Sequence, residues 1–297
     1  MIHYCKQSLF RFRELIHLKG DYSPISEGFD TVSGVRYFYN MNQKEYPRCR
    51  REISSFFDSL REQTAGMSAF EAEKYVYDLM FDSIVYNENT EHSGSVYGAL
   101  IEHNARCEGI SKAFAWCMNE LDIGCITIAG TPLWENTSIF SSHSWNIVCL
   151  DGVWYHVDLT ADDLKTSPDE HVIPLYSFLN SNDETIRATH LPSQIFTDMG
   201  LPSCSSEELN YHVMYDLVLT PEDDTEKGLF DIMDRYYKEE GEVFLRVRFT
   251  SADSYNSFTD VWESLYNSYL VSHGLPYRYA TLFYNDVGKS VCIHIDG

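Results

Sequence analysis

The chain has 297 residues, 44% of them hydrophobic, which is enough for about two packed domains. Its formal net charge is −23, from 45 acidic and 22 basic side chains, and it contains no apolar run long enough to cross a bilayer. An acidic chain of this kind repels a phosphate backbone, so we expect neither a nucleic-acid-binding protein nor a membrane-spanning one.

The N-terminal part of the chain combines strand and helix patterns. Residues 1–60 are expected to form an N-terminal extension, with a strand at Val35–Tyr39 and a helix at Arg48–Leu60. Ser68 followed by Glu71 is a capping box, which predicts a second helix that runs to about Phe81. This second helix opens a predicted core domain over residues 61–203.

Cys107 is predicted to lie in the first turn of a buried helix. Apolar residues follow it at helical spacing, and Gly124 is placed to end the helix. The free backbone N–H groups and the macrodipole of a helix N-terminus stabilise a thiolate, and the same N–H groups suit an oxyanion. The apolar positions are Ile110, Ala113, Phe114, Met118 and Leu121.

A β-hairpin is predicted after this helix. Two strand-like runs, Ser144–Leu150 and Val153–Leu159, flank Asp151-Gly152, which is a strong signal for a two-residue turn. A turn of that length places Leu150 opposite Val153, and this pair fixes the register of the whole hairpin.

The register brings two polar residues to one face. Trp145 opposes Asp158, so His143 and Asp158 are diagonal neighbours, at a spacing of roughly 7–8 Å between backbones that leaning side chains can bridge. The hairpin therefore predicts a His143–Asp158 pair. The opposite face is apolar and is expected to pack into the core through Val148, Leu150, Val153, Tyr155, Val157 and Leu159.

The last third of the chain is expected to form a separate domain. Residues 162–203 are rich in proline, which predicts an irregular connection, and residues 204–297 follow a βαβαββ pattern. This small α+β domain shows no catalytic cluster, and we expect it to dock a partner. The expected strands are Tyr211–Leu219, Val243–Thr250, Tyr277–Tyr284 and Ser290–Ile295, and the helices are Glu222–Glu240 and Ser251–His273.

Cys107, His143 and Asp158 are the candidate catalytic residues. A thiol enzyme needs a nucleophile, a base that takes the thiol proton and a group that orients the base. Each residue also has a structural alternative: a buried cysteine, a half-buried hydrogen-bonded histidine and a cap at the end of a strand. The helix start at Cys107 and the hairpin register favour the catalytic interpretation.

The motifs around these residues resemble the transglutaminase-like superfamily, especially its bacterial members. The resemblance covers roughly residues 65–170 and implies an α+β, papain-like core, in which a helix bearing Cys107 packs on an antiparallel sheet bearing His143 and Asp158. Tyr97 and Trp145 are candidates for an oxyanion donor or a wall of the site, with plain packing as the alternative. The motifs are Tyr97-Gly98-Ala99-Leu100, Cys107-Glu108-Gly109, His143-Ser144-Trp145-Asn146 and Trp154-Tyr155-His156-Val157-Asp158-Leu159-Thr160.

The resemblance implies a cysteine-dependent acyl-transfer enzyme that acts on peptide or glutamine carboxamide bonds through a thioester. A water acceptor gives a protease or amidohydrolase, and an amine acceptor gives a transglutaminase. The sequence leaves this choice, the second oxyanion donor and the natural peptide or protein substrate open. The alternative from another class is a non-catalytic binding module that keeps the fold.

No cofactor or metal is expected, because the sequence has no Cys-x-x-Cys pair, His-Glu-x-x-His run or calcium-loop spacing. The eight cysteines are scattered, and the first residues lack the apolar stretch of a signal peptide. We therefore expect a reduced, cytoplasmic protein. The alternative is a secreted or cell-surface protein whose signal peptide is absent from this sequence.

Overall fold

A computed structural model describes residues 45–134, 142–162, 164–223 and 225–297 of the chain. The strand expected at Val35–Tyr39 lies outside these residues. The chain divides into two compact units: Met1–Thr127 with Thr166–Pro168, and Ile128–Lys165 with Asp169–Gly297. The domains expected at 1–60, 61–203 and 204–297 remain a prediction. None of the described helices has a stretch that could cross a lipid bilayer.

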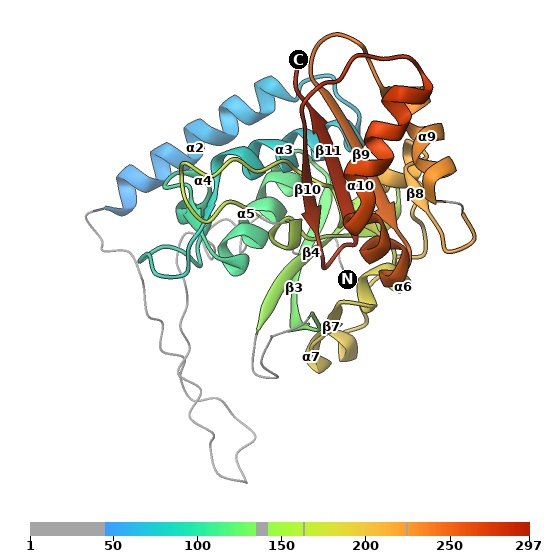
Figure 1. The fold of residues 1–297 in the computed structure, drawn as a ribbon. Helices are drawn as coiled ribbons and strands as arrows, with labels where there is room; N and C mark the ends of the chain where they lie inside the picture. Colours follow the sequence, from blue (N-terminus) through green and yellow to red (C-terminus); the bar gives the residue numbers. More distant parts are fainter. Residues whose placement is uncertain (1–44, 135–141, 163, 224) are drawn as a thin grey trace. The chain divides into compact units, whose positions relative to one another are not determined.

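The first unit is mainly helical (Figure 1). A buried apolar face runs along each of its longer helices, through Phe57 and Leu60 in one and Phe114 and Met118 in another. One short parallel strand pair joins the segments before and after Tyr97. The elements are α2 (Tyr46–Gln63), α3 (Ala69–Ser83), β1 (Val85–Tyr86), α4 (Val96–Leu100), β2 (Asn104–Ala105) and α5 (Cys107–Glu120).

The two helix starts that matter most agree with the sequence. Ser68 and Glu71 form the predicted capping box at the start of α3. Helix α5 begins at Cys107, as predicted.

The predicted end of α5 is wrong. The helix ends at Glu120, Asp122 takes the left-handed conformation (φ 60°), and Gly124 begins the next strand. The N–H of Ile123 then bonds back to the carbonyl of Met118 at 2.9 Å, which closes the last turn. Aspartate is one of the few residues other than glycine that tolerates this conformation, so the turn does not need Gly124.

Gly109 allows the Cys107 helix to approach the preceding loop. A Cβ atom at this position would lie 2.3 Å from the backbone carbonyl oxygen of Ser93. That carbonyl cannot move freely, because it accepts a hydrogen bond from the N–H of Arg106 at 3.0 Å. The close approach gives a physical reason for the glycine in the Cys107-Glu108-Gly109 motif.

Gly109→Ala should therefore destabilise the first unit by about 1–3 kcal/mol, the usual cost of overpacking. The matched control is Gly228→Ala in α9 (Thr225–Tyr236), where the added atom meets only the side-chain Cδ2 of Leu219. A side-chain tip can move, so the control should lose far less. Urea unfolding followed by circular dichroism measures both. Equal losses in the two variants would show that the Ser93 contact does not constrain the helix.

The second unit contains a five-stranded sheet with strand order β6-β5-β4-β3-β7. Strands β4 and β5 form the predicted hairpin, with Leu150 opposite Val153. Asp151 and Gly152 both have positive φ values, 51° and 89°, as a type I′ turn requires. The strands are β3 (Gly124–Pro132), β4 (His143–Leu150), β5 (Val153–Val157), β6 (Leu179–Ser181) and β7 (His190–Pro192).

Two details of this sheet differ from the prediction. Both faces of the hairpin are buried, since Trp145 and Ile147 on one face are as inaccessible as Val148 on the other. Residues 162–203 are also less irregular than expected. They supply the edge strands β6 and β7 and two short helices, α6 (Asp183–Arg187) and α7 (Gln194–Asp198).

The C-terminal part of the second unit forms a four-stranded sheet with order β10-β11-β9-β8. Helices α9 and α10 pack against it, and their apolar residues share one core with β9 and β11 (Figure 1). The prediction of a strand at Tyr211–Leu219 is mostly wrong, because the first half of this segment is a short helix capped by the side chain of Asn210. The elements are α8 (Tyr211–Met214), β8 (Val218–Leu219), β9 (Val243–Phe249), α10 (Ala252–Ser272), β10 (Ala280–Asn285) and β11 (Ser290–Ile295).

This C-terminal segment is tied to the loop that follows β5. The side-chain amide of Asn285 donates a buried hydrogen bond to the carbonyl of Ala161 at 2.6 Å. The hydroxyls of Ser177 and Ser290 are 2.5 Å apart. The segment is therefore bonded to residues that follow β5, inside the same unit.

His212, in α8, is fully buried, and neither ring nitrogen has a hydrogen-bond partner among the described residues. Burial, with Arg248 and Arg246 nearby, holds the pKa of His212 well below its ordinary value.

The unfolded chain binds a proton at His212 at a higher pH than the folded chain does. Above about pH 6.5, His212 is neutral in both states and the free energy of unfolding keeps its full value. Below that pH the unfolded chain gains a proton that the folded chain does not, so the free energy of unfolding falls by up to ~1.4 kcal/mol per pH unit. His212→Leu should flatten the fall in unfolding free energy between pH 7 and 5, and the exposed His171→Leu should not. Identical pH slopes in denaturant titrations of both variants would contradict this assignment.

Candidate active site

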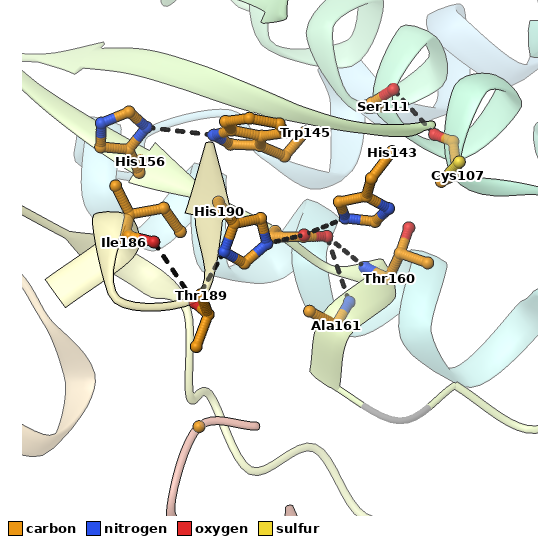
Figure 2. Close-up of polar contacts among 12 residues, drawn as sticks. Cys107, Ser111, His143, Trp145, His156, Thr160, Ala161, Ile186, Thr189 and His190 are labelled. Atoms are coloured by element: carbon orange, nitrogen blue, oxygen red, sulfur yellow. Dashed lines mark hydrogen bonds and ion pairs between the residues drawn. The ribbon is translucent and has the colours of Figure 1, made fainter. Parts of the chain in front are cut away.

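Asp158 is the centre of a buried hydrogen-bonded cluster in the second unit. Its four partners, His143, Thr160, Ala161 and His190, are labelled in Figure 2. Its Oδ1 accepts the backbone N–H groups of Thr160 and Ala161, at 2.9 and 3.1 Å. Its Oδ2 contacts the Nε2 atoms of His143 and His190, the latter at 2.9 Å. Every contact of this carboxylate is thus with a group that can donate a hydrogen bond.

These contacts keep Asp158 ionised. Burial alone would raise the pKa of the carboxyl group, which is only 1% exposed. The charge and hydrogen bonds of His143, and then those of His190, outweigh burial and lower the pKa of Asp158 below its ordinary value. A buried carboxylate of this kind is a fixed negative charge across the ordinary pH range.

His143 begins β4, and its ring lies against two tryptophans. The ring of Trp145 is nearly parallel to it, with centroids 6.0 Å apart, and Trp134 meets it edge to face at 5.2 Å. The contact between His143 Nε2 and Asp158 agrees with the register predicted for the hairpin. Since an ionised carboxylate only accepts hydrogen bonds, Nε2 of His143 carries a proton and Nδ1 is the basic nitrogen.

Cys107 belongs to the first unit, at the start of α5, and is 8% exposed. The phenol of Tyr86 lies near Cys107 and donates to the carboxylate of Glu88 at 2.9 Å. Burial, followed by the nearby Cys107 thiol and Glu88, raises the pKa of Tyr86 above its ordinary value. Tyr86 is therefore a polar neighbour of the helix start at Cys107. No sequence motif pointed to Tyr86.

The two candidates for the wall or oxyanion donor have different surroundings. The hydroxyl of Tyr97 donates to the Glu52 carboxylate of α2 at 2.7 Å. Trp145 is fully buried beside His143, and its indole N–H donates to Nδ1 of His156 at 3.2 Å. Tyr97 is therefore engaged within the helices of the first unit, whereas Trp145 has the contact with the His143 ring that a wall residue needs.

His190 is a residue of this cluster that the sequence analysis missed. It lies in the segment expected to be irregular, and it reaches Asp158 because β7 pairs with β3 at the edge of the sheet. Its other ring nitrogen, Nδ1, is 2.8 Å from the hydroxyl of Thr189 (Figure 2). A short edge strand that contains one proline has no clear sequence signal, so only the fold could reveal this contact.

Two groups of side chains within the described residues bring potential metal ligands within 4.8 Å of one another: His143, Asp158 and His190, and His156, Asp183 and Cys204. In the first group, both rings meet the same carboxylate oxygen through hydrogen bonds. In the second, the indole of Trp145 donates to Nδ1 of His156, so the proton of the neutral ring is on Nε2, 3.1 Å from Asp183. A metal-bound histidine instead donates its outer N–H to an acceptor. We interpret both groups as hydrogen-bonded clusters.

The comparisons with known proteins give one family match, over part of the chain. Residues 58–159 match the sequence model of the transglutaminase-like superfamily, and this range includes Cys107, His143 and Asp158. This segment is therefore a transglutaminase-like region, and the chain has the α+β fold class expected from its sequence. No curated protein matches the chain by sequence.

Two solved structures are similar to the chain at 13% identity. One is described as "Crystal structure of a TGase", with a TM-score of 0.34, and the match covers 62% of this chain and 43% of that one. The other is described as "The Crystal Structure of a Putative Cysteine Protease from Cytophaga hutchinsonii", with a TM-score of 0.33, and the match covers 40% of this chain and 43% of that one. Each alignment therefore spans less than half of the solved protein.

Proposed function

We propose that the protein is a cysteine-dependent acyl-transfer enzyme in which Cys107 is the nucleophile, His143 the base and Asp158 the orienting group. The observation that carries the proposal is the buried pair of His143 with an ionised Asp158, which leaves Nδ1 of His143 as the basic nitrogen. The superfamily match over residues 58–159 includes four of the eight cysteines, and the position at the start of α5 supports the choice of Cys107 among them.

The proposed reaction begins when Nδ1 of His143 takes the thiol proton of Cys107. The sulfur attacks the carbonyl carbon of a peptide or glutamine carboxamide, and the carbonyl electrons move to oxygen. When the C–N bond breaks, His143 returns its proton to the leaving amine or ammonia, and a thioester on Cys107 remains. Asp158 stabilises the protonated ring of His143 throughout.

The acceptor decides the product. Water attacking the thioester gives a carboxylic acid, and a primary amine gives a new amide; in both cases His143 takes the proton of the attacking group. The negative charge of the chain favours a cationic acceptor such as a lysine side chain by electrostatic attraction. Both acceptors pass through the same thioester, so the assignments of Cys107, His143 and Asp158 do not depend on which one is used.

The test is alkylation of the thiols by iodoacetamide near neutral pH, with the modified cysteines mapped by mass spectrometry. We expect fast and selective labelling of Cys107 that is slowed by His143→Ala. Cys149, the most accessible of the described cysteines, is the internal reference. Labelling of Cys107 no faster than that of Cys149 would contradict the proposal and favour a non-catalytic module that keeps the fold. Supplying a tagged primary amine with a glutamine peptide then separates amide formation from hydrolysis.

A further inference from the structure

Two histidines share one oxygen of Asp158. His143 and His190 both contact Oδ2, while Oδ1 is held by the backbone N–H groups of Thr160 and Ala161 (Figure 2). His190 comes from β7, beyond the residues that match the superfamily, and its side chain is completely buried. The carboxylate that would orient the base is thus itself held by a second ring.

The protons of the cluster can be assigned from the groups present. The ionised carboxylate accepts only, so His190 presents its Nε2–H to Oδ2. The single proton of the Thr189 hydroxyl has two possible acceptors, Nδ1 of His190 at 2.8 Å and the carbonyl of Ile186 at 3.3 Å. We assign it to the shorter contact, so Nδ1 of His190 carries no proton and accepts from this hydroxyl. A neutral His190 satisfies every contact in this scheme.

This arrangement has a consequence for His143. A second hydrogen bond to Oδ2 withdraws electron density from the oxygen that His143 uses, so it weakens the attraction between Asp158 and a protonated His143 ring. It also adds a fourth donor to the three that hold the carboxylate of Asp158 in its plane. Loss of the bond would leave Asp158 more basic toward His143.

We propose that His190 is a positioning residue of the active site, which holds Asp158 in place and limits how strongly Asp158 stabilises the protonated form of His143. The proposal rests on the proposed function only where it treats His143 as the base. The structural alternative is packing alone, since the His190 ring lies between Trp134, Trp145 and Phe178, with centroids 5.1, 5.1 and 5.3 Å away. A packing role requires a ring, whereas a positioning role requires an N–H donor.

Two substitutions separate these roles. His190→Phe keeps an aromatic ring in the cage and removes the donor. His190→Gln removes the ring and keeps an N–H group that can reach Oδ2. A third variant, Thr189→Val, leaves His190 unchanged but removes the hydroxyl that donates to Nδ1, which weakens Nε2–H as a donor.

The experiment is an NMR titration of the His143 ring in the full chain carrying Cys107→Ala, so that no catalysis is needed. We expect His190→Phe to raise the titration midpoint of His143 by about 0.5–1 pH unit, Thr189→Val to raise it by less, and His190→Gln to restore the original value. An unchanged midpoint in His190→Phe would overturn the proposal. If the His190→Phe variant does not fold, an unchanged His143 midpoint in the Thr189→Val variant would overturn the proposal instead.

The outcome is independent of the proposed function. If iodoacetamide does not distinguish Cys107 from Cys149, the acyl-transfer assignment fails, yet the shift in the His143 midpoint still measures the effect of His190. If labelling is selective but the midpoint does not move, the catalytic assignment stands and His190 is a packing residue. In the active protein, the pH dependence of Cys107 labelling should shift in the same direction as the midpoint.

Discussion

Cys107→Ser should abolish thioester formation while leaving the fold intact. The hydroxyl and thiol groups are similar in size, so the start of α5 should not change. A serine hydroxyl, however, is far less acidic than a thiol, and His143 would have to remove its proton without forming a stable ion pair. We expect the acylation rate to fall by at least about 10⁴-fold, as when a nucleophile is removed from a related triad.

The measurement is the burst of p-nitrophenol released when the protein is mixed with p-nitrophenyl acetate. The original protein should release a stoichiometric burst and retain an acetyl group on Cys107, which hydroxylamine removes. Cys149→Ser is the matched control, because that cysteine is on β4 and is partly accessible. A burst that survives Cys107→Ser, or one that disappears with Cys149→Ser, would show that the nucleophile has been misassigned.

Asp158→Asn should reduce acylation by about 10³–10⁴-fold, the effect of the equivalent amide substitution in a serine triad. The amide oxygen can still accept the N–H groups of Thr160 and Ala161. The amide nitrogen, however, would then face two ring N–H groups, so both histidines must move their proton from Nε2 to Nδ1. His190 tolerates this change, because the Thr189 hydroxyl can accept its Nδ1–H.

His143 does not tolerate the change, because a proton on Nδ1 removes its basic nitrogen. The loss in Asp158→Asn should therefore appear in the acylation rate and not in urea stability. Asp151→Asn, at the exposed hairpin turn, is the control for the loss of one charge. Asp158→Ala should differ from both, because it leaves four buried donors without an acceptor and should cost about 3–5 kcal/mol. An active Asp158→Asn would rule out Asp158 as the orienting group.

The features that the sequence predicted correctly depend on local signals. The Asp151-Gly152 turn and the alternation around it determine the hairpin register, and the register predicts the contact between His143 and Asp158. The Ser68–Glu71 capping box and the start of α5 also depend on residues within one or two turns. These features are determined by residues adjacent in the sequence, so a short segment is enough to predict each of them.

The missed features depend on contacts between distant segments. His190 joins the cluster through a three-residue edge strand, and Tyr86 approaches Cys107 through the pairing of β1 with β2. Tyr211–Leu219 alternates like a strand, but the cap at Asn210 starts a helix there instead. His190 and Tyr86 are positioned by strand pairing with distant parts of the chain, and the helix at Tyr211 is started by a single capping residue. The periodicity of apolar residues predicts neither kind of feature.

The hydrogen bond from Asn285 to Ala161 limits how this protein can be divided. Ala161 uses its N–H to hold Asp158 and its carbonyl to receive the Asn285 amide, so the backbone of one residue links the carboxylate to the C-terminal sheet. The superfamily match ends at residue 159, before Thr160, Ala161 and His190. A fragment trimmed to that boundary would contain all three proposed catalytic residues but would lose three of the four donors that keep Asp158 in place. The part of the protein needed for the proposed activity is thus expected to be larger than the part that is recognisable by its motifs.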